Sequence, residues 1–295
     1  LRHGYEGGQP MNHPLLQATT TAEVEAYPWP DPAWIDVSRI RADAASYAGQ
    51  VAILGGEWSP FWHDAIDLLG MENLLYKMYD MPALVDAVLA HIVDYYFAVS
   101  QRIFEEAADL IDVFFIGNDF GSQTGPLISD RLFRRFLLPH LERLIDLGHA
   151  YGLKVLLHCC GGFEPLIPAM IEAGLDGLQG LQPNCRGMDP ASLKARYGAD
   201  LLLMGSINSQ QLIEGTPDSV RAETRRILEI MNVSPEGLAY RGATAYLPGY
   251  GEPVESAAVH DLIARARQHG AGPLYVLALG AITNGLCHPA GTGYS

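Results

Sequence analysis

The sequence predicts an α/β protein built from parallel βα units. Five short apolar runs alternate with segments whose apolar residues recur at helical spacing, a pattern that gives parallel strands joined by helices. Polar clusters follow these runs, and the carboxyl ends of parallel strands meet at one edge, so the predicted site lies on that edge. The pattern alone does not separate an open sheet from a closed barrel.

The composition favours a small-molecule substrate. The 295 residues carry a formal net charge of -15, and such a surface repels nucleic acid and anionic membranes. No apolar run approaches the roughly 20 residues that span a bilayer, so we expect no membrane segment. The four cysteines do not form a disulfide framework in a chain of this length, and a reducing cytoplasm fits them best.

Residues 1–50 have no long apolar period, and prolines alternate with other residues in the segment 27–32. Alternating prolines hold a chain extended, which predicts an ordered surface wrap. We expect Tyr27, Trp29 and Trp34 to pack on the body of the domain. A proline-rich docking peptide is the alternative.

The first two predicted strands are each followed by a loop that contains a carboxylate. Glu57 follows the strand at 51–55 and either lines a ligand pocket or caps the next helix. Asp119 follows the strand at 110–116; we regard it as a candidate for chemistry, although an Asp between glycines is often a turn residue. The residues assigned to catalysis, as side chains that line the pocket, are Glu57, Asp119 and Gln123.

The third predicted strand, at 153–157, ends in an imidazole and two thiols. Because side chains alternate along an extended chain, His158 and Cys160 share one face and Cys159 points to the other. A soft metal such as zinc needs this spacing. The alternative is a core histidine beside two buried thiols, since two ligands do not complete a zinc site.

The remaining elements repeat the alternation. Ser129 starts a helix that continues over 132–151, with Pro139 as a kink or break, and Thr216 and Pro217 start the last helix. The other predicted helices and strands cover 62–78, 82–107, 163–173, 177–181, 190–197 and 201–204. The residues assigned to cofactor binding are Asn118, Gly205 and Asn208.

Six short segments, in order across about residues 13–230, resemble the superfamily of uroporphyrinogen decarboxylase and its methyltransferase relatives. They are residues 25–31, 70–74, 117–129, 158–161, 187–190 and 215–217. As a set they are specific, and singly none is. The resemblance implies a TIM-type (β/α)8 barrel with its pocket at the strand carboxyl ends, here incomplete because the first strands and the last one are missing or replaced.

The two branches of the superfamily imply different chemistry. In the methyltransferase branch, His158 and Cys160 match the first two zinc ligands, and zinc activates a thiol for methyl transfer from a corrinoid, here supplied by a partner protein. The third ligand is a cysteine near the last barrel strand, for which Cys185 or Cys287 is the guess. The decarboxylase branch needs no metal but a cationic pocket, for which Arg186 is the best candidate.

The last part of the chain departs from this pattern. Residues 225–284 resemble an internal piece of an inosine-uridine nucleoside hydrolase, in which Thr283 matches a minor calcium ligand. The aspartate cluster that holds calcium in that family does not occur in this sequence, so we reject hydrolase activity.

We therefore divide the chain into a barrel at 1–230 and a hydrolase-like fragment with an unmatched tail at 231–295. The junction suggests a chimera, because it cuts both folds. Three hypotheses follow: zinc-dependent methyl transfer, metal-free decarboxylation of a porphyrinogen-like substrate, and an inactive fragment whose open sheet edges promote self-association. In an alternative to the chimera, residues 274–279 form the closing strand and bring Cys287 near His158.

Overall fold

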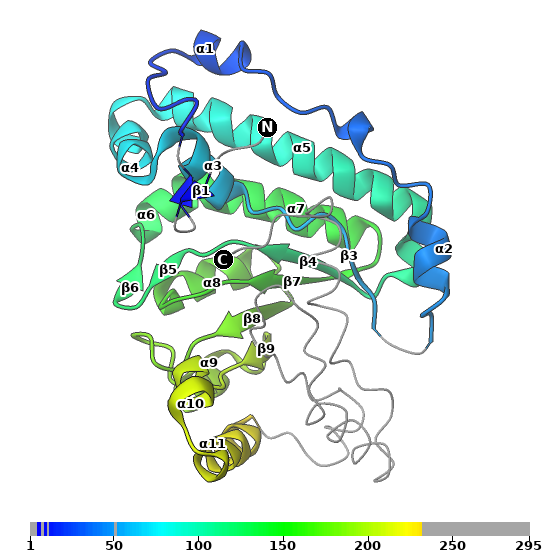
Figure 1. Ribbon diagram of the computed structural model, residues 1–295, viewed down its shortest axis with the longest axis vertical. Helices are drawn as coiled ribbons and strands as arrows, with labels where there is room; N and C mark the ends of the chain where they lie inside the picture. The colour runs from blue at the N-terminus through cyan, green and yellow to red at the C-terminus, as the bar shows by residue number, and fades with distance from the viewer. Residues whose placement is uncertain (1–4, 7–8, 11, 50–51, 232–295) are drawn as a thin grey trace.

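The computed structural model describes residues 5–6, 9–10, 12–49 and 52–231, and its centre is a parallel sheet (Figure 1). The order of its strands is β3-β4-β7-β8-β9, and each strand pairs in parallel with its neighbours. The strands are β3 (Leu54–Gly55), β4 (Val113–Gly117), β7 (Lys154–His158), β8 (Gly177–Leu181) and β9 (Leu202–Gly205). The five strands confirm the predicted parallel βα units, and over the described residues the sheet does not close into a barrel.

Helices cover the sheet and follow the predicted alternation. Between β3 and β4 lie α3 (Phe61–Leu69), α4 (Met71–Asp80) and α5 (Pro82–Ala107). The later helices are α6 (Asp130–Leu132), α7 (Leu138–Ala150), α8 (Ile167–Glu172), α9 (Pro190–Tyr197), α10 (Ser209–Glu214) and α11 (Pro217–Ile230). In Figure 1, α5 and α7 lie side by side over one face of the sheet, in agreement with the contacts of α7 with both α5 and β7.

The predicted break near Pro139 takes the form of a π-helical turn. Residues Phe133–Leu137 form this turn between α6 and α7, and Pro139 lies in the first turn of α7. Proline has no backbone N–H to donate to the preceding turn, which interrupts the regular α-helical hydrogen bonds. The π-helical turn lies at this interruption. Phe133, Phe136 and Leu137 are buried, which keeps the turn packed on the core.

Helix α5 is the main core helix, and it corrects one expectation. By length and composition, the segment Pro82–Leu110 could cross a membrane, and it is the one such helix in the part of the chain that the structure describes. The expectation that no apolar segment reaches this length was therefore wrong. Core helices of soluble proteins pass the same test, and the face of α5 that includes Val88, Leu89 and Phe104 is buried within the protein.

The N-terminal segment wraps along α5, as predicted. Its short elements are α1 (Thr21–Glu25), a 3₁₀ turn (Pro32–Trp34) and α2 (Ile40–Ala45), and all contact α5. Trp29 stacks on His91 with ring centroids 4.7 Å apart, and Tyr27 also packs against the core. Trp34 does not, because its side chain is 75% exposed, so this part of the prediction was wrong.

Several short elements were not predicted. Among them are the helices α1, α2 and α10 and two small hairpins, β1 (Tyr5–Glu6) with β2 (Gln9–Pro10), and β5 (Gly121–Ser122) with β6 (Gly125–Pro126). Residues 232–295 lie outside the described residues. Thr283, Cys287, the candidate closing strand at 274–279 and nearly all of the predicted second domain fall there, so those predictions are untested.

Candidate metal centre

The ends of two inner strands, β4 and β7, place the candidate metal ligands. Gly117 pairs with His158 in the sheet register, so the residues that follow the two strands emerge side by side. Two hydrogen bonds join these loops: the Asn118 N–H donates to the carbonyl oxygen of His158 at 2.9 Å, and the Cys160 N–H donates to Asp119 Oδ1 at 2.7 Å. The Asp119 carboxylate is therefore fixed beside the His158-Cys-Cys160 segment.

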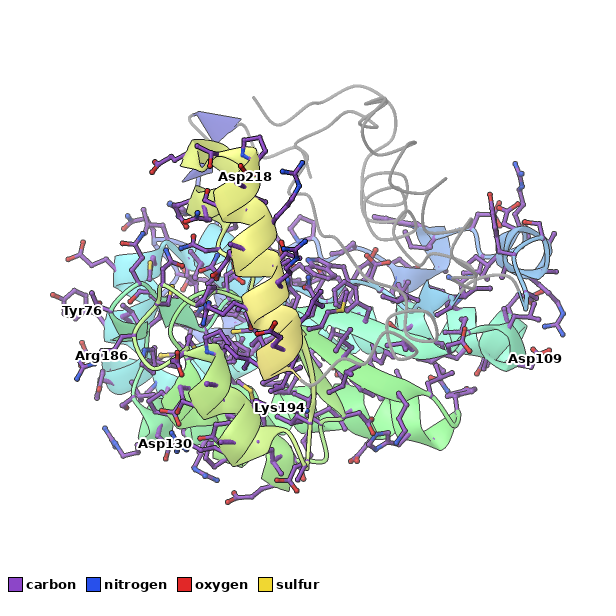
Figure 2. All side chains as sticks on the ribbon, turned by 90° about the horizontal axis from the view of Figure 1, so that it is seen from below. Tyr76, Asp109, Asp130, Arg186, Lys194 and Asp218 are labelled. Atoms are coloured by element: carbon purple, nitrogen blue, oxygen red, sulfur yellow. The ribbon has the colours of Figure 1, made fainter. Side chains whose placement is uncertain are left out.

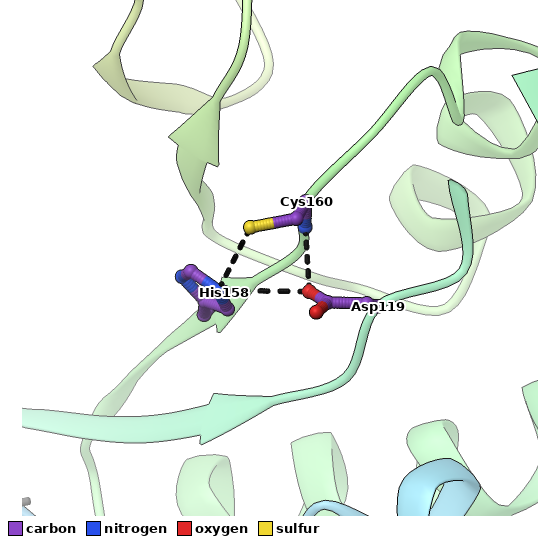
Figure 3. A group of neighbouring side chains, drawn as sticks. All are labelled: Asp119, His158 and Cys160. Carbon is purple, nitrogen blue, oxygen red and sulfur yellow. Dashed lines mark hydrogen bonds and ion pairs between the residues drawn. The ribbon is translucent and has the colours of Figure 1, made fainter. Parts of the chain in front are cut away.

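Three side chains of different chemistry converge at this point (Figure 3). The distance from Cys160 Sγ to His158 Nε2 is 3.3 Å, and that from His158 Nε2 to Asp119 Oδ1 is 3.6 Å. One ligand atom from each residue lies within 4.8 Å of the others, and among the described residues this is the one group of three or more that could hold a metal ion. His158 and Cys160 share a face, as predicted, while Cys159 is fully buried.

Neighbouring residues orient the His158 ring. Its Nδ1 is hydrogen-bonded to the side-chain oxygen of Gln179, a buried residue on β8. Because an amide oxygen only accepts, Nδ1 carries the proton and Nε2 has a free lone pair on the Cys160 side. Gly180 makes room for this arrangement, since a Cβ there would lie 2.8 Å from the ring. Trp58 packs against the ring with centroids 5.4 Å apart.

The pKa values of Asp119 and Cys160 shift in opposite directions. Burial raises the pKa of Asp119, but the hydrogen bond from His63, the electrostatic attraction of the nearby His158 ring and the hydrogen bond from the Cys160 amide outweigh it and lower the pKa to about 2. Burial, followed by the negative charge of Asp119, raises the pKa of the Cys160 thiol to about 12. Without a cation, the site therefore holds an ionised carboxylate and a neutral thiol.

This donor set fits zinc. Imidazole nitrogen, cysteine sulfur and carboxylate oxygen are its usual protein ligands, and catalytic zinc sites have three protein ligands and a fourth position for substrate. A nearby cation would also stabilise the Cys160 thiolate, which burial disfavours. A hydrogen-bonded Nδ1, as in His158, is typical of metal-bound histidines.

Asp119, and not Cys185, is the third member of this group. Cys185 is buried, and its thiol donates to Gln182 Oε1 at 3.4 Å. It does not belong to the group of converging ligand atoms. Cys159 accepts a hydrogen bond from the Phe120 N–H at 3.4 Å, and burial raises its pKa well above the usual range, so it belongs to the core.

The structure brings in a residue that the sequence analysis did not select. His63 Nε2 lies 3.4 Å from Asp119 Oδ2, on the side of the carboxylate away from His158. Burial lowers the pKa of His63, but Asp119, Asp64 and Asp67 together raise it above its ordinary value. The available signal was that His63 follows the same strand end as Glu57, within the first turn of the next helix.

The other predicted site residues have different surroundings. Glu57 does not cap α3, because the N-terminus of that helix has no side-chain cap. Burial, followed by the charge of Asp64, raises the pKa of the Glu57 carboxyl.

The Asn118 side chain is buried and hydrogen-bonded to backbone groups through both its oxygen and its nitrogen. The Gln123 side chain is exposed. Gly205 ends β9, and Asn208 caps α10. Their assigned roles in pocket lining and cofactor binding are untested.

Comparisons with known proteins agree with this architecture. The family model of uroporphyrinogen decarboxylase (URO-D) matches residues 14–240. No curated protein matches. Among solved structures, a methyltransferase from Methanosarcina mazei is similar, with a TM-score of 0.53 and 22% identity. The match covers 66% of this chain and 54% of that protein, and at this identity it supports the fold alone. Because the family model covers most of the sequence, the chain belongs to the uroporphyrinogen decarboxylase family.

Proposed function

We propose that this protein is a zinc-dependent methyltransferase that transfers a methyl group from a corrinoid to a thiol, with the corrinoid supplied by a partner protein. The observation that carries the proposal is the convergence of Asp119, His158 and Cys160 at the carboxyl ends of β4 and β7. Zinc bound there lowers the pKa of a thiol and so supplies a thiolate nucleophile. The similarity to a methyltransferase fold is consistent with this chemistry.

The residues around the proposed site have distinct roles. His158 presents its Nε2 lone pair because Gln179 holds Nδ1. Cys160 gives up its thiol proton when it becomes a ligand, and Asp119 is already ionised. With one imidazole and two anionic ligands, the protein contributes two negative charges, which balance the charge of the zinc ion before an anionic thiolate binds.

The proposed site is compatible with an unclosed sheet. β4 and β7 are inner strands, each paired on both sides, and Gln179 lies on the next strand, β8. None of the three ligands lies on an edge strand, so the site does not need a closed barrel to bring them together. This counts against the hypothesis of an inactive fragment.

Decarboxylation of a porphyrinogen-like substrate is less well supported. It needs cations that grip substrate carboxylates, and Arg186 was the best candidate. The Arg186 side chain is exposed and lies at the periphery of the molecule (Figure 2). Among the described residues, the side chains within ion-pair distance of Asp119 are the histidines His63 and His158, at 3.4 and 3.6 Å.

The test is elemental analysis of the purified full chain. We expect about one zinc per chain in the wild type and a large loss in His158→Ala, because a zinc site with only two protein ligands binds weakly. His149→Ala is the matched control, since His149 also pairs with an aspartate but at the opposite end of the sheet. A wild-type stoichiometry below about one tenth would refute the metal proposal.

A further inference from the structure

His63 comes from a different part of the fold than the three ligands, yet it contacts one of them. It lies in the first turn of α3, and its side chain is 44% exposed. Its Nε2 is 3.4 Å from Asp119 Oδ2, whereas Asp119 Oδ1 accepts from the Cys160 N–H at 2.7 Å and lies 3.6 Å from His158 Nε2. The two carboxylate oxygens therefore have different neighbours.

The position of His63 is tied to that of Asp119 through the backbone. The buried side chain of Asn118, the residue before Asp119, accepts from the Trp62 N–H at 2.9 Å and donates to the Ser59 carbonyl oxygen at 3.0 Å. These bonds fix the start of α3 against the loop that follows β4. The residue next to His63 is thus bonded to the residue next to Asp119, which sets the distance between the two side chains.

We propose that His63 is a positioning residue for Asp119, which fixes the carboxylate rotation so that Oδ1 faces the ligand atoms of His158 and Cys160. This inference rests on the proposed zinc site and adds a fourth residue to it. A carboxylate rotates about its terminal bond unless both oxygens are held. Here the Cys160 N–H is hydrogen-bonded to Oδ1, and the His63 ring nitrogen lies 3.4 Å from Oδ2. These two contacts keep Oδ1 on the side of the carboxylate that faces His158, whose Nε2 is 3.6 Å away.

The experiment compares His63→Ala with His63→Gln in the full chain. Glutamine has an N–H that can reach Asp119 Oδ2 in place of the imidazole, whereas alanine has none. The first readout is the zinc dissociation constant, determined by competition with a chelator. The second is the visible absorption of the cobalt(II)-substituted protein, which reports ligand geometry. His149→Ala is the control, because His149 Nε2 lies 2.7 Å from Asp176 Oδ2 far from the site.

We expect His63→Ala to weaken zinc binding about 10- to 100-fold and to change the cobalt spectrum, as loss of an outer hydrogen bond to a metal ligand does. His63→Gln should recover most of both, and His149→Ala should change neither. If His63→Ala does not fold, His63→Asn is used in its place, because the asparagine side chain is too short to reach Asp119 Oδ2. If the wild type binds zinc but His63→Ala has the same zinc affinity and cobalt spectrum, this inference is overturned and the proposed function is not. A wild type that binds no zinc would overturn the proposed function and this inference with it.

Discussion

Two aspartates lie at opposite ends of the same sheet, and each contacts histidine and a backbone N–H. They differ in the other side chains that surround them. At the carboxyl end, Asp119 contacts two histidines and a backbone N–H. At the amino end, Asp176 accepts from His149 Nε2 at 2.7 Å, from Lys154 Nζ at 2.6 Å and from the Val155 N–H at 2.9 Å. Their contacts alone therefore do not distinguish a metal ligand from a structural carboxylate.

The pKa does not distinguish them either. Burial raises the pKa of both aspartates, and in both the hydrogen-bonding partners outweigh burial and lower it. The difference lies in the atoms around them. Asp176 has a lysine partner, which neutralises it, whereas Asp119 lies beside a thiol and an imidazole nitrogen that could also bind a metal ion. A metal site is therefore indicated by converging lone pairs and not by a perturbed carboxylate.

The largest expected effect is at the carboxyl end of the sheet, where Asp119 lies beside the Cys160 thiol. Because burial and Asp119 raise its pKa to about 12, its thiolate fraction near pH 8 is about a thousandfold below that of an ordinary thiol. We expect iodoacetamide to modify Cys160 about that much more slowly in the metal-free folded chain than in the urea-unfolded chain. Mass spectrometry of the peptide, in a Cys159→Ala background, measures the rate.

A pH series separates the raised pKa of the Cys160 thiol from simple steric protection against the reagent. The alkylation rate of the folded chain should keep rising above about pH 9, where an ordinary thiol levels off. A plateau near that pH would show an unperturbed thiol and contradict the electrostatic description of the site.

The second prediction compares the same substitution, aspartate to asparagine, at the two positions. Asp119→Asn should weaken zinc binding by about 100-fold or more, because a neutral amide oxygen replaces an anionic ligand. Asp176→Asn should leave zinc affinity within about twofold of the wild type, since that residue lies at the other end of the sheet. Isothermal titration calorimetry with zinc measures both. Equal losses in the two variants would mean that the effect is on folding and not on the site.

Most of the fold could be predicted because its signals are local. The bounds of α5 and α9 match the predicted ranges 82–107 and 190–197, and each has proline in its first turn. Strand β8 likewise matches 177–181. The unpredicted elements are short: α1 has five residues, α2 and α10 have six each, and the strands of the hairpins have two each. Such elements contain too few residues to establish a periodic pattern.

The site was predicted only where its residues are close in the chain. His158 and Cys160 could be paired because strand alternation places residues two apart on one face. Asp119 was chosen by its position after a strand, but its placement beside His158 and Cys160 depends on the register of β4 against β7. His63 was missed because its contact with Asp119 spans 56 positions and depends on the docking of α3. No local pattern encodes that contact.

A third carboxylate, Asp64 on α3, sharpens the comparison, because its hydrogen-bonding partner within the described part of the chain is a hydroxyl and not a cation. Asp64 on α3 accepts a hydrogen bond from the neutral Tyr96 hydroxyl, and burial raises its pKa to about 6. The folded state thus favours the protonated form. The cost of ionising it in the fold is absent below about pH 3.8 and reaches its full size above about pH 6, where it amounts to about 2 to 3 kcal/mol.

Asp64→Asn should therefore stabilise the protein by about that amount near pH 8 and by almost nothing near pH 4, because the amide is always neutral and still accepts from Tyr96. Urea denaturation at the two pH values measures the free energy of unfolding. A gain of the same size at both pH values would show that burial of the charge is not the cause.

The smallest expected effect concerns the lysine that neutralises Asp176. The Lys154 side chain is 74% exposed, so its ion pair with Asp176 is screened by solvent and contributes at most about 1 kcal/mol. Lys154→Met should lower the free energy of unfolding by that much at low salt and by less in about 1 M sodium chloride. Zinc affinity should not change in either condition. Because His149 and the Val155 N–H also bind Asp176, the carboxylate keeps two of its three donors in this variant. A loss well above 1 kcal/mol would mean that the lysine charge, and not the network of fixed donors, holds the amino end of the sheet together.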